Sequence, residues 1–202
     1  MEIAASEATG VLTLEASGAI TQTGAIDADL ASSFTAGANA ITLSNASNDF
    51  SGAVSLSNSG TNDVSLTDVN ALDLGTVSVG QNLTVTTGGA LTDSGAITVG
   101  SLATLVSTGQ SVTLGDSTTA NFGSLDFAGA AVSIKEGSSM EIAASEATGV
   151  LTLEASGAIT QTGAIDADLA SSFTAGANAI TLSNASNCLL YTSDAADERS
   201  WG

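Results

Sequence analysis

The sequence predicts an all-β protein whose short strands stack in parallel coils, a β-solenoid or parallel β-helix. Two features predict it: the chain repeats itself, and aliphatic residues alternate with hydroxyl residues. Residues 140–187 repeat residues 1–48 letter for letter, so the period is 139 (140 − 1). Such self-similarity is typical of architectures in which one structural unit stacks on the next. Met140 lies inside a running segment, so we expect its twin Met1 to be internal and the chain to be a slice truncated at both ends.

The alternation is an aliphatic residue, then Thr or Ser, then another aliphatic residue. It occurs at residues 12–14, 41–43, 64–66, 83–85, 112–114, 132–134, 151–153 and 180–182. In a strand this pattern places both aliphatic side chains on one face and the hydroxyl on the other. We therefore expect Leu83 and Leu151 to point inward and to occupy the same rung position.

A weaker repeat, about half as long, lies inside the longer one, because residues 19–43 align without gaps with residues 90–114. Shorter apolar segments fill the intervals, separated by Gly, Asn, Asp and Ser, and nothing sustains the helical period of 3.6. About three short strands then make one coil of roughly 20–25 residues, stacked about 4.8 Å above the last. The chain should contain roughly eight such rungs.

The composition agrees with many strands joined by tight turns: 22 Gly, no Pro and 3% aromatic residues in a chain that is 43% hydrophobic. Disorder is the alternative for a Gly- and Ser-rich chain, but disordered chains lack regularly spaced β-branched residues. The net charge of −19 disfavours nucleic acid as a partner, since phosphate binding needs clustered Lys and Arg. No apolar run approaches the roughly 18 residues of a membrane-spanning helix, so we expect no membrane insertion of this segment.

The sequence offers no catalytic residue, no cofactor-binding residue and no metal ligand. Residues 1–187 contain no His, Cys or Tyr, which excludes nucleophilic triads and zinc sites there. Carboxylate pairs of the glycosidase kind stay open, although the sequence singles out no pair. Asparagine residues mark the expected turns, where Asn caps backbone amides and tolerates left-handed backbone. These are Asn45, Asn48, Asn58, Asn62, Asn70 and Asn121.

Three runs of residues, 48–56, 71–75 and 82–92, resemble the repeats of large bacterial surface exoproteins. These are the filamentous-haemagglutinin-like adhesins and their relatives, secreted by two-partner secretion or autotransport. The resemblance covers residues 1–187. It implies a right-handed parallel β-helix that serves as a stalk on the bacterial cell surface. It also implies an outer-membrane secretion partner, or a barrel of the protein's own, outside this slice.

Residues 188–202 interrupt the pattern. After Asn187 the repeat should continue as at residues 49–52, but the chain reads CLLYTSDAADERSWG. Residues 188–198 resemble the translation of a transposase sequencing-library adapter, and we interpret 188–202 as a non-native tail. Residues 188–191 could still continue a strand, because the last coil offers an unpaired edge.

The sequence thus predicts a non-catalytic structural stalk segment of a secreted adhesin or exoprotein, located outside the cell. One alternative is a β-solenoid module that binds a host or surface glycan or protein through exposed Thr or Asn ladders. Aligned Thr-x-Thr rows would favour it, and only Thr84-Val85-Thr86 is clear. A carbohydrate-active β-helix is the other alternative, and an acidic groove would support it.

Overall fold

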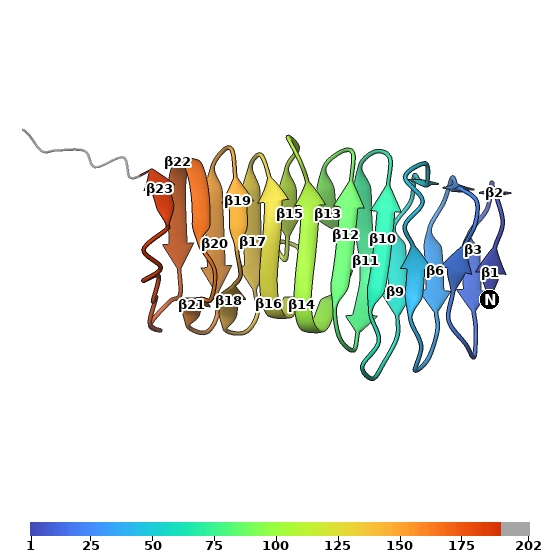
Figure 1. The fold of residues 1–202 in the computed structure, drawn as a ribbon, viewed down its shortest axis with the longest axis horizontal. Helices are drawn as coiled ribbons and strands as arrows, with labels where there is room; N and C mark the ends of the chain where they lie inside the picture. Colours follow the sequence, from blue (N-terminus) through green and yellow to red (C-terminus); the bar gives the residue numbers. More distant parts are fainter. Residues whose placement is uncertain (191–202) are drawn as a thin grey trace, which may run out of the picture.

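A computed structural model describes residues 1–190 of the chain. No helix occurs in this part, and the strands stack in about nine parallel coils around one core (Figure 1), which confirms the β-solenoid. The expected number of rungs, roughly eight, is close to this number.

All the paired strands run parallel to each other. The strands of the first half are β1 (Glu2–Ile3), β2 (Ser6–Ala8), β3 (Leu12–Glu15), β4 (Thr21–Gln22), β5 (Ile26–Ala28), β6 (Ser32–Thr35), β7 (Ile41–Leu43), β8 (Asp49–Phe50), β9 (Val54–Ser57), β10 (Val64–Asp68), β11 (Leu72–Val79) and β12 (Leu83–Thr87). Those of the second half are β13 (Leu91–Asp93), β14 (Ile97–Ser107), β15 (Val112–Leu114), β16 (Ala120–Gly129), β17 (Val132–Glu136), β18 (Met140–Ile142), β19 (Ser145–Ala147), β20 (Leu151–Ala155), β21 (Ile159–Gln161), β22 (Ile165–Thr174) and β23 (Cys188–Leu190).

Each coil passes the core twice, and we name the two passes side A and side B. On side A the inward residues Ile41, Val64, Leu83, Ala103, Leu125 and Ile142 pair in succession. On side B the succession is Leu72, Leu91, Val112, Val132, Leu151 and Ser171. Leu83 and Leu151 are both fully buried, as expected. The expectation that they share a rung position was wrong, because they lie on opposite sides of the core.

The alternation between the two sides explains why the two copies of the weaker repeat begin 71 residues apart (90 − 19). On side A, Ile20 pairs with Ile41, which pairs with Val64, which pairs with Leu83, so Leu83 lies three coils beyond Ile20. The next strand along the chain begins at Leu91, on side B. One copy of the weaker repeat, which we call the half-repeat, therefore makes three and a half coils. Three further coils lead from Leu91 to Leu151, and the following strand begins at Ile159 on side A. The full period is therefore seven coils, and only the full period returns a segment to its own side.

The half-repeat also moves a bend from one side to the other. In the first coils side A is split into two short strands, as in β4 and β5, while side B is the single strand β6. In the middle coils side A is a single strand, such as β12. Side B is there split into β13 and the start of β14. The same sequence pattern therefore shapes opposite sides of the solenoid in successive half-repeats.

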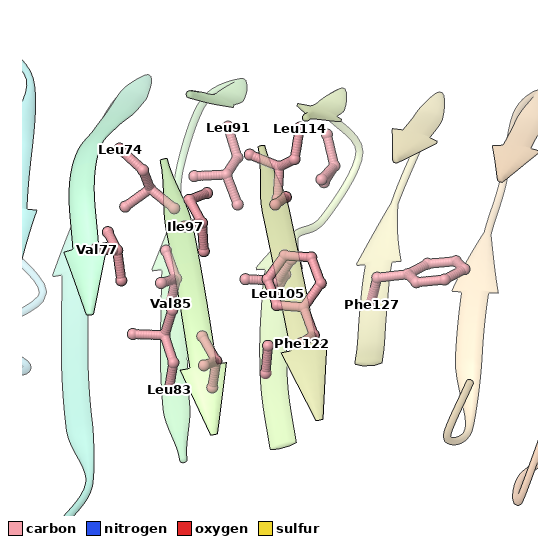
Figure 2. Close-up of a cluster of buried hydrophobic side chains, with 14 of the residues drawn as sticks. Leu74, Val77, Leu83, Val85, Leu91, Ile97, Leu105, Leu114, Phe122 and Phe127 are labelled. Atoms are coloured by element: carbon pink, nitrogen blue, oxygen red, sulfur yellow. The ribbon is translucent and has the colours of Figure 1, made fainter. Parts of the chain in front are cut away.

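The core is a continuous column of aliphatic side chains between the two sides. Figure 2 shows Leu83 and Val85 of side A beside Val77 and Ile97 of side B. All four are at most 1% exposed. Phe34 and Phe50 meet edge to face, with ring centroids 6.0 Å apart. Burying this apolar surface is the main favourable term for the fold, at about 25 cal/mol per Å².

β23 adds the beginning of the predicted tail to the solenoid. Cys188, Leu189 and Leu190 pair with Asp166, Ala167 and Ala170 of β22. These three residues thus form a strand on the unpaired edge of the last coil, as we expected. The remainder of the tail, residues 191–202, lies outside the described residues, and its origin from an adapter stays a prediction.

Candidate functional site

Hydroxyl side chains stack along the outside of side A. In-register pairing places Thr42, Ser65, Thr84 and Thr104 one above another on consecutive coils. Each of these side chains is at least partly exposed. Because paired strands lie about 4.8 Å apart, the hydroxyl groups form an evenly spaced row parallel to the solenoid axis.

Side B carries two rows of polar side chains, most of which are hydroxyl residues. One row consists of Asp73, Thr92, Thr113, Ser133, Thr152 and Ser172. The other consists of Glu15, Thr35, Ser57, Ser78, Thr98 and Asn121. The sequence alone showed only Thr84-Val85-Thr86, because the members of a row stand a whole coil apart along the chain. The coil register brings them together.

Buried polar side chains hold a corner loop, residues 44–48, at the bend of side A. Asn48 is fully buried. Its Nδ2 donates to Oε1 of Gln22 (2.9 Å), and its Oδ1 accepts from Nε2 of Gln22 (2.8 Å) and from the Ile26 N–H (2.9 Å). The Asn48 amide also donates to the backbone carbonyls of Leu43 and Thr67. One side chain thus ties three coils together and leaves none of its own polar atoms unpaired.

The half-repeat places a second corner loop, residues 115–119, at the bend of side B. Gly115 begins this loop with φ +76°, a backbone conformation that favours glycine. Asp93, in the coil above, accepts from the Gly115 N–H (2.8 Å) and from the Thr118 hydroxyl, which also reaches the Gly95 carbonyl (2.9 Å). Asp93 occupies in this half-repeat the position that Gln22 has in the one before.

The third corner loop, residues 183–187, repeats the first. Gln161 and Asn187 exchange hydrogen bonds of 2.8 and 2.9 Å, and Asn187 accepts from the Ile165 N–H. The three loops occur once per half-repeat. Each is anchored from the coil above by Gln22, Asp93 or Gln161.

In the coil below each of the first two corner loops, a buried carboxylate binds a backbone N–H that follows the loop. Asp68 and Glu136 are 2% and 1% exposed. Oδ1 of Asp68 accepts from the Phe50 N–H (3.2 Å), and Oε1 of Glu136 accepts from the Phe122 N–H (3.0 Å). Their other oxygens, Oδ2 and Oε2, have no hydrogen-bond partner.

Burial shifts the titration of both carboxyl groups. It raises the pKa of Asp68 to about 6, with a smaller contribution from the negative charge of Asp49, against the lowering effect of backbone N–H donors such as that of Phe50. Burial also raises the pKa of Glu136, opposed by hydrogen bonds from Phe122 and Ser138. Desolvation dominates in both, since it disfavours the charged form. Sequence reasoning missed Asp68 and Glu136 because nothing local distinguishes them from the exposed acids.

Of the asparagines expected at turns, Asn45, Asn48, Asn58, Asn62 and Asn70 do lie between strands. Asn121 does not: it lies within β16, where it ends a hydroxyl row. No residue other than glycine has a positive φ in the described part, so left-handed backbone is not what these asparagines supply. Their amides cap the corners instead. Asn58, for example, donates to the Asn39 and Asn62 carbonyls and accepts from the Gly80 N–H.

Two surface concavities elsewhere are lined in part by acidic side chains. A concavity of about 320 Å³ is lined by Asp126 and Glu146, and one of about 220 Å³ by Lys135 and Glu136. Lys135 and Glu154 form an ion pair of 3.0 Å, half exposed and therefore of little energetic weight. Among residues 1–190 no three acidic, His or Cys side chains converge as metal ligands. In the same residues no apolar helix of membrane-spanning length is found.

Comparison with known proteins identifies the repeat itself. No curated protein and no solved structure matches the chain. The model of a family described as repeats of unknown function (DUF5649) matches residues 1–57, 61–127 and 129–192. These three matches cover nearly the whole chain, and their starts lie about one half-repeat apart. The chain therefore belongs to the DUF5649 family of repeats.

Proposed function

We propose that this chain is a non-catalytic structural stalk segment of a large secreted bacterial adhesin or exoprotein. The observation that carries the proposal is the stacking of parallel strands from coil to coil, on both sides of one core. Each coil satisfies the backbone hydrogen bonds of the next, so such a structure grows in one dimension by repetition. A rod of this kind holds whatever it carries at a set distance from its base.

The resemblance of residues 48–56, 71–75 and 82–92 to filamentous-haemagglutinin-like repeats supports the cellular setting. Residues 1–187 hold no Cys, which suits export of an unfolded chain across an outer membrane. On this proposal the segment lies outside the cell, and an outer-membrane secretion partner exports the protein that contains it.

Labelling of intact cells tests the proposal. Antibodies against residues 1–187 should label the surface of the source bacterium without permeabilisation, with immunogold particles lying away from the outer membrane. An antibody against a periplasmic protein is the control and should label permeabilised cells only. Labelling of the repeat that needs permeabilisation would rule out the stalk.

The hydroxyl rows favour a second candidate, a module that binds a surface glycan along side B. The row from Thr92 to Ser172 offers a regular series of donors and acceptors. Retention of the chain on immobilised polysaccharides, and its loss in the triple variant Thr113→Val, Ser133→Ala, Thr152→Val, would support this candidate. Equal retention of variant and wild type would exclude these hydroxyl groups as the binding surface.

A further inference from the structure

The lower anchors of the first two corner loops share one arrangement. In each, a phenylalanine shortly after the loop, Phe50 or Phe122, donates its N–H to one oxygen of a carboxylate in the next coil. In each, the second oxygen of that carboxylate is buried and has no partner. The two sites lie on opposite sides of the core and differ in residue type, Asp68 and Glu136. Their similarity therefore comes from the half-repeat, not from a local accident of sequence.

An ionised carboxylate in such a place is costly. A buried polar atom left unpaired loses its hydration without compensation, and a buried charge loses more. Adding a proton removes the charge while the oxygen that accepts from Phe50 or Phe122 keeps its bond. The neutral form therefore fits both sites better than the charged form.

No cation within the described residues compensates either carboxylate. Asp49, on the strand above, is the charged group that acts on Asp68, and its charge is also negative. Beside Glu136, Lys135 lies on the same strand and Glu154 on the paired strand β20. The Lys135 amine is engaged with Glu154, at 3.0 Å. Asp49 therefore favours uptake of a proton by Asp68, and burial alone has that effect on Glu136.

We propose that Asp68 and Glu136 are proton-dependent anchors, which hold residues 44–51 and 115–122 more tightly in mildly acidic than in alkaline surroundings. The two anchors respond to pH in the same direction, so their effects on the rod add. Longer arrays of the same half-repeat would tighten in proportion to their number of anchors.

The direction follows from linkage. A carboxyl whose pKa is higher in the folded than in the unfolded chain binds more protons when folded. For Asp68, with a folded pKa of about 6 and an ordinary value of 3.8, the stabilising effect is complete below about pH 4. It is lost as the pH rises through 6. Glu136 changes in the same direction.

Hydrogen exchange tests this at the loops themselves. We would compare wild type with Asp68→Asn and Glu136→Gln, two variants that keep the acceptor for the phenylalanine N–H but carry no charge. At pH 7.5, Asp68→Asn should slow exchange in residues 44–51 at least about tenfold relative to wild type at that pH, and Glu136→Gln should slow it in residues 115–122. At pH 4 the difference for Asp68→Asn should shrink to less than about threefold, and that for Glu136→Gln should shrink as well. Each variant should leave the other loop unchanged.

The matched control is Glu141→Gln, which removes an exposed carboxylate from β18 with the same change of net charge. It should alter neither loop. Equal exchange in wild type and both neutral variants at pH 7.5 would overturn the proposal, as would slowing in Glu141→Gln of the same size. If one neutral variant fails to fold, the other decides alone. If CaCl2 at pH 7.5 slows exchange in both loops of the wild type and not in the two variants, the carboxylates bind a cation. That result would also overturn the proposal.

Discussion

Identical side chains in identical sequence have different surroundings in this molecule. Leu14 and Leu153 are the same position of the duplicated segment. Leu153 is fully buried because Ile134 of β17 pairs above it, whereas Leu14 is only partly buried. Burial here depends on the neighbouring coil and not on the residue or its sequence neighbours.

The pair gives a prediction with a built-in control. Leu153→Ala should lower the free energy of unfolding by about 2–5 kcal/mol, the range for a truncated buried leucine. Leu14→Ala should cost clearly less, about 1 kcal/mol, because less area leaves the core. Urea titration of both variants measures the two losses. Equal losses would contradict the stacking of β17 on β20.

Leu83→Asp tests the inward orientation on side A. The substitution buries a carboxylate with no partner in a fully apolar position, at a cost of several kcal/mol. Thermal unfolding should show a large drop of the melting temperature. The conservative variant Leu83→Met should stay close to wild type, and wild-type-like melting of Leu83→Asp would show that the register of β12 is wrong.

At the scale of the element, the corner loops replace regular strand pairing with side-chain hydrogen bonds. The Asn48 side chain makes five of these around residues 44–48: two with Gln22 and one each with Ile26, Leu43 and Thr67. A buried donor or acceptor left unpaired costs about 1–3 kcal/mol, so such a network is stable only when complete.

Asn48→Ala should therefore destabilise the protein by about 3 kcal/mol, since the Ile26 N–H and the Leu43 and Thr67 carbonyls lose their bond to Asn48. Asn45→Ala is the control, because Asn45 caps only the exposed Ser47 N–H (2.9 Å) and should cost less than about 1 kcal/mol. Denaturant midpoints compare the two. A similar effect of both variants would mean that the buried network does not stabilise the loop.

At the scale of the whole molecule, the number of coils sets the length of the rod. The full period of the duplication makes seven coils, and stacked strands lie about 4.8 Å apart, so one period spans about 34 Å of axis. Because the period restores every segment to its own side, an added copy should continue the core without a break.

Inserting a second copy of residues 49–187 directly after Asn187 should lengthen the particle by about 34 Å at constant cross-section. Small-angle X-ray scattering gives both quantities, as the maximum dimension and the cross-sectional radius of gyration. A Gly- and Ser-rich insertion about one coil long, unrelated to the half-repeat, serves for comparison and should fray the rod. A thicker particle after insertion of the full period would contradict the seven-coil count.

The sequence by itself determined the strands, the direction of their side chains and the absence of imidazole or thiol chemistry in residues 1–187. These properties are local: alternation with a period of two decides which side chain faces inward wherever a strand forms. It also determined the repeat, and through the repeat the stacking of coils.

Only the tertiary structure decided which strand lies above which. That choice depends on the summed length of every strand and turn in between: Leu151 follows Leu83 by three and a half coils and therefore lies on the opposite side. It also brought together partners far apart in the chain, such as Gln22 with Asn48 and Phe122 with Glu136. The buried carboxylates followed from that register. An acid becomes an anchor only when another coil covers it, and no local pattern records what that coil will be.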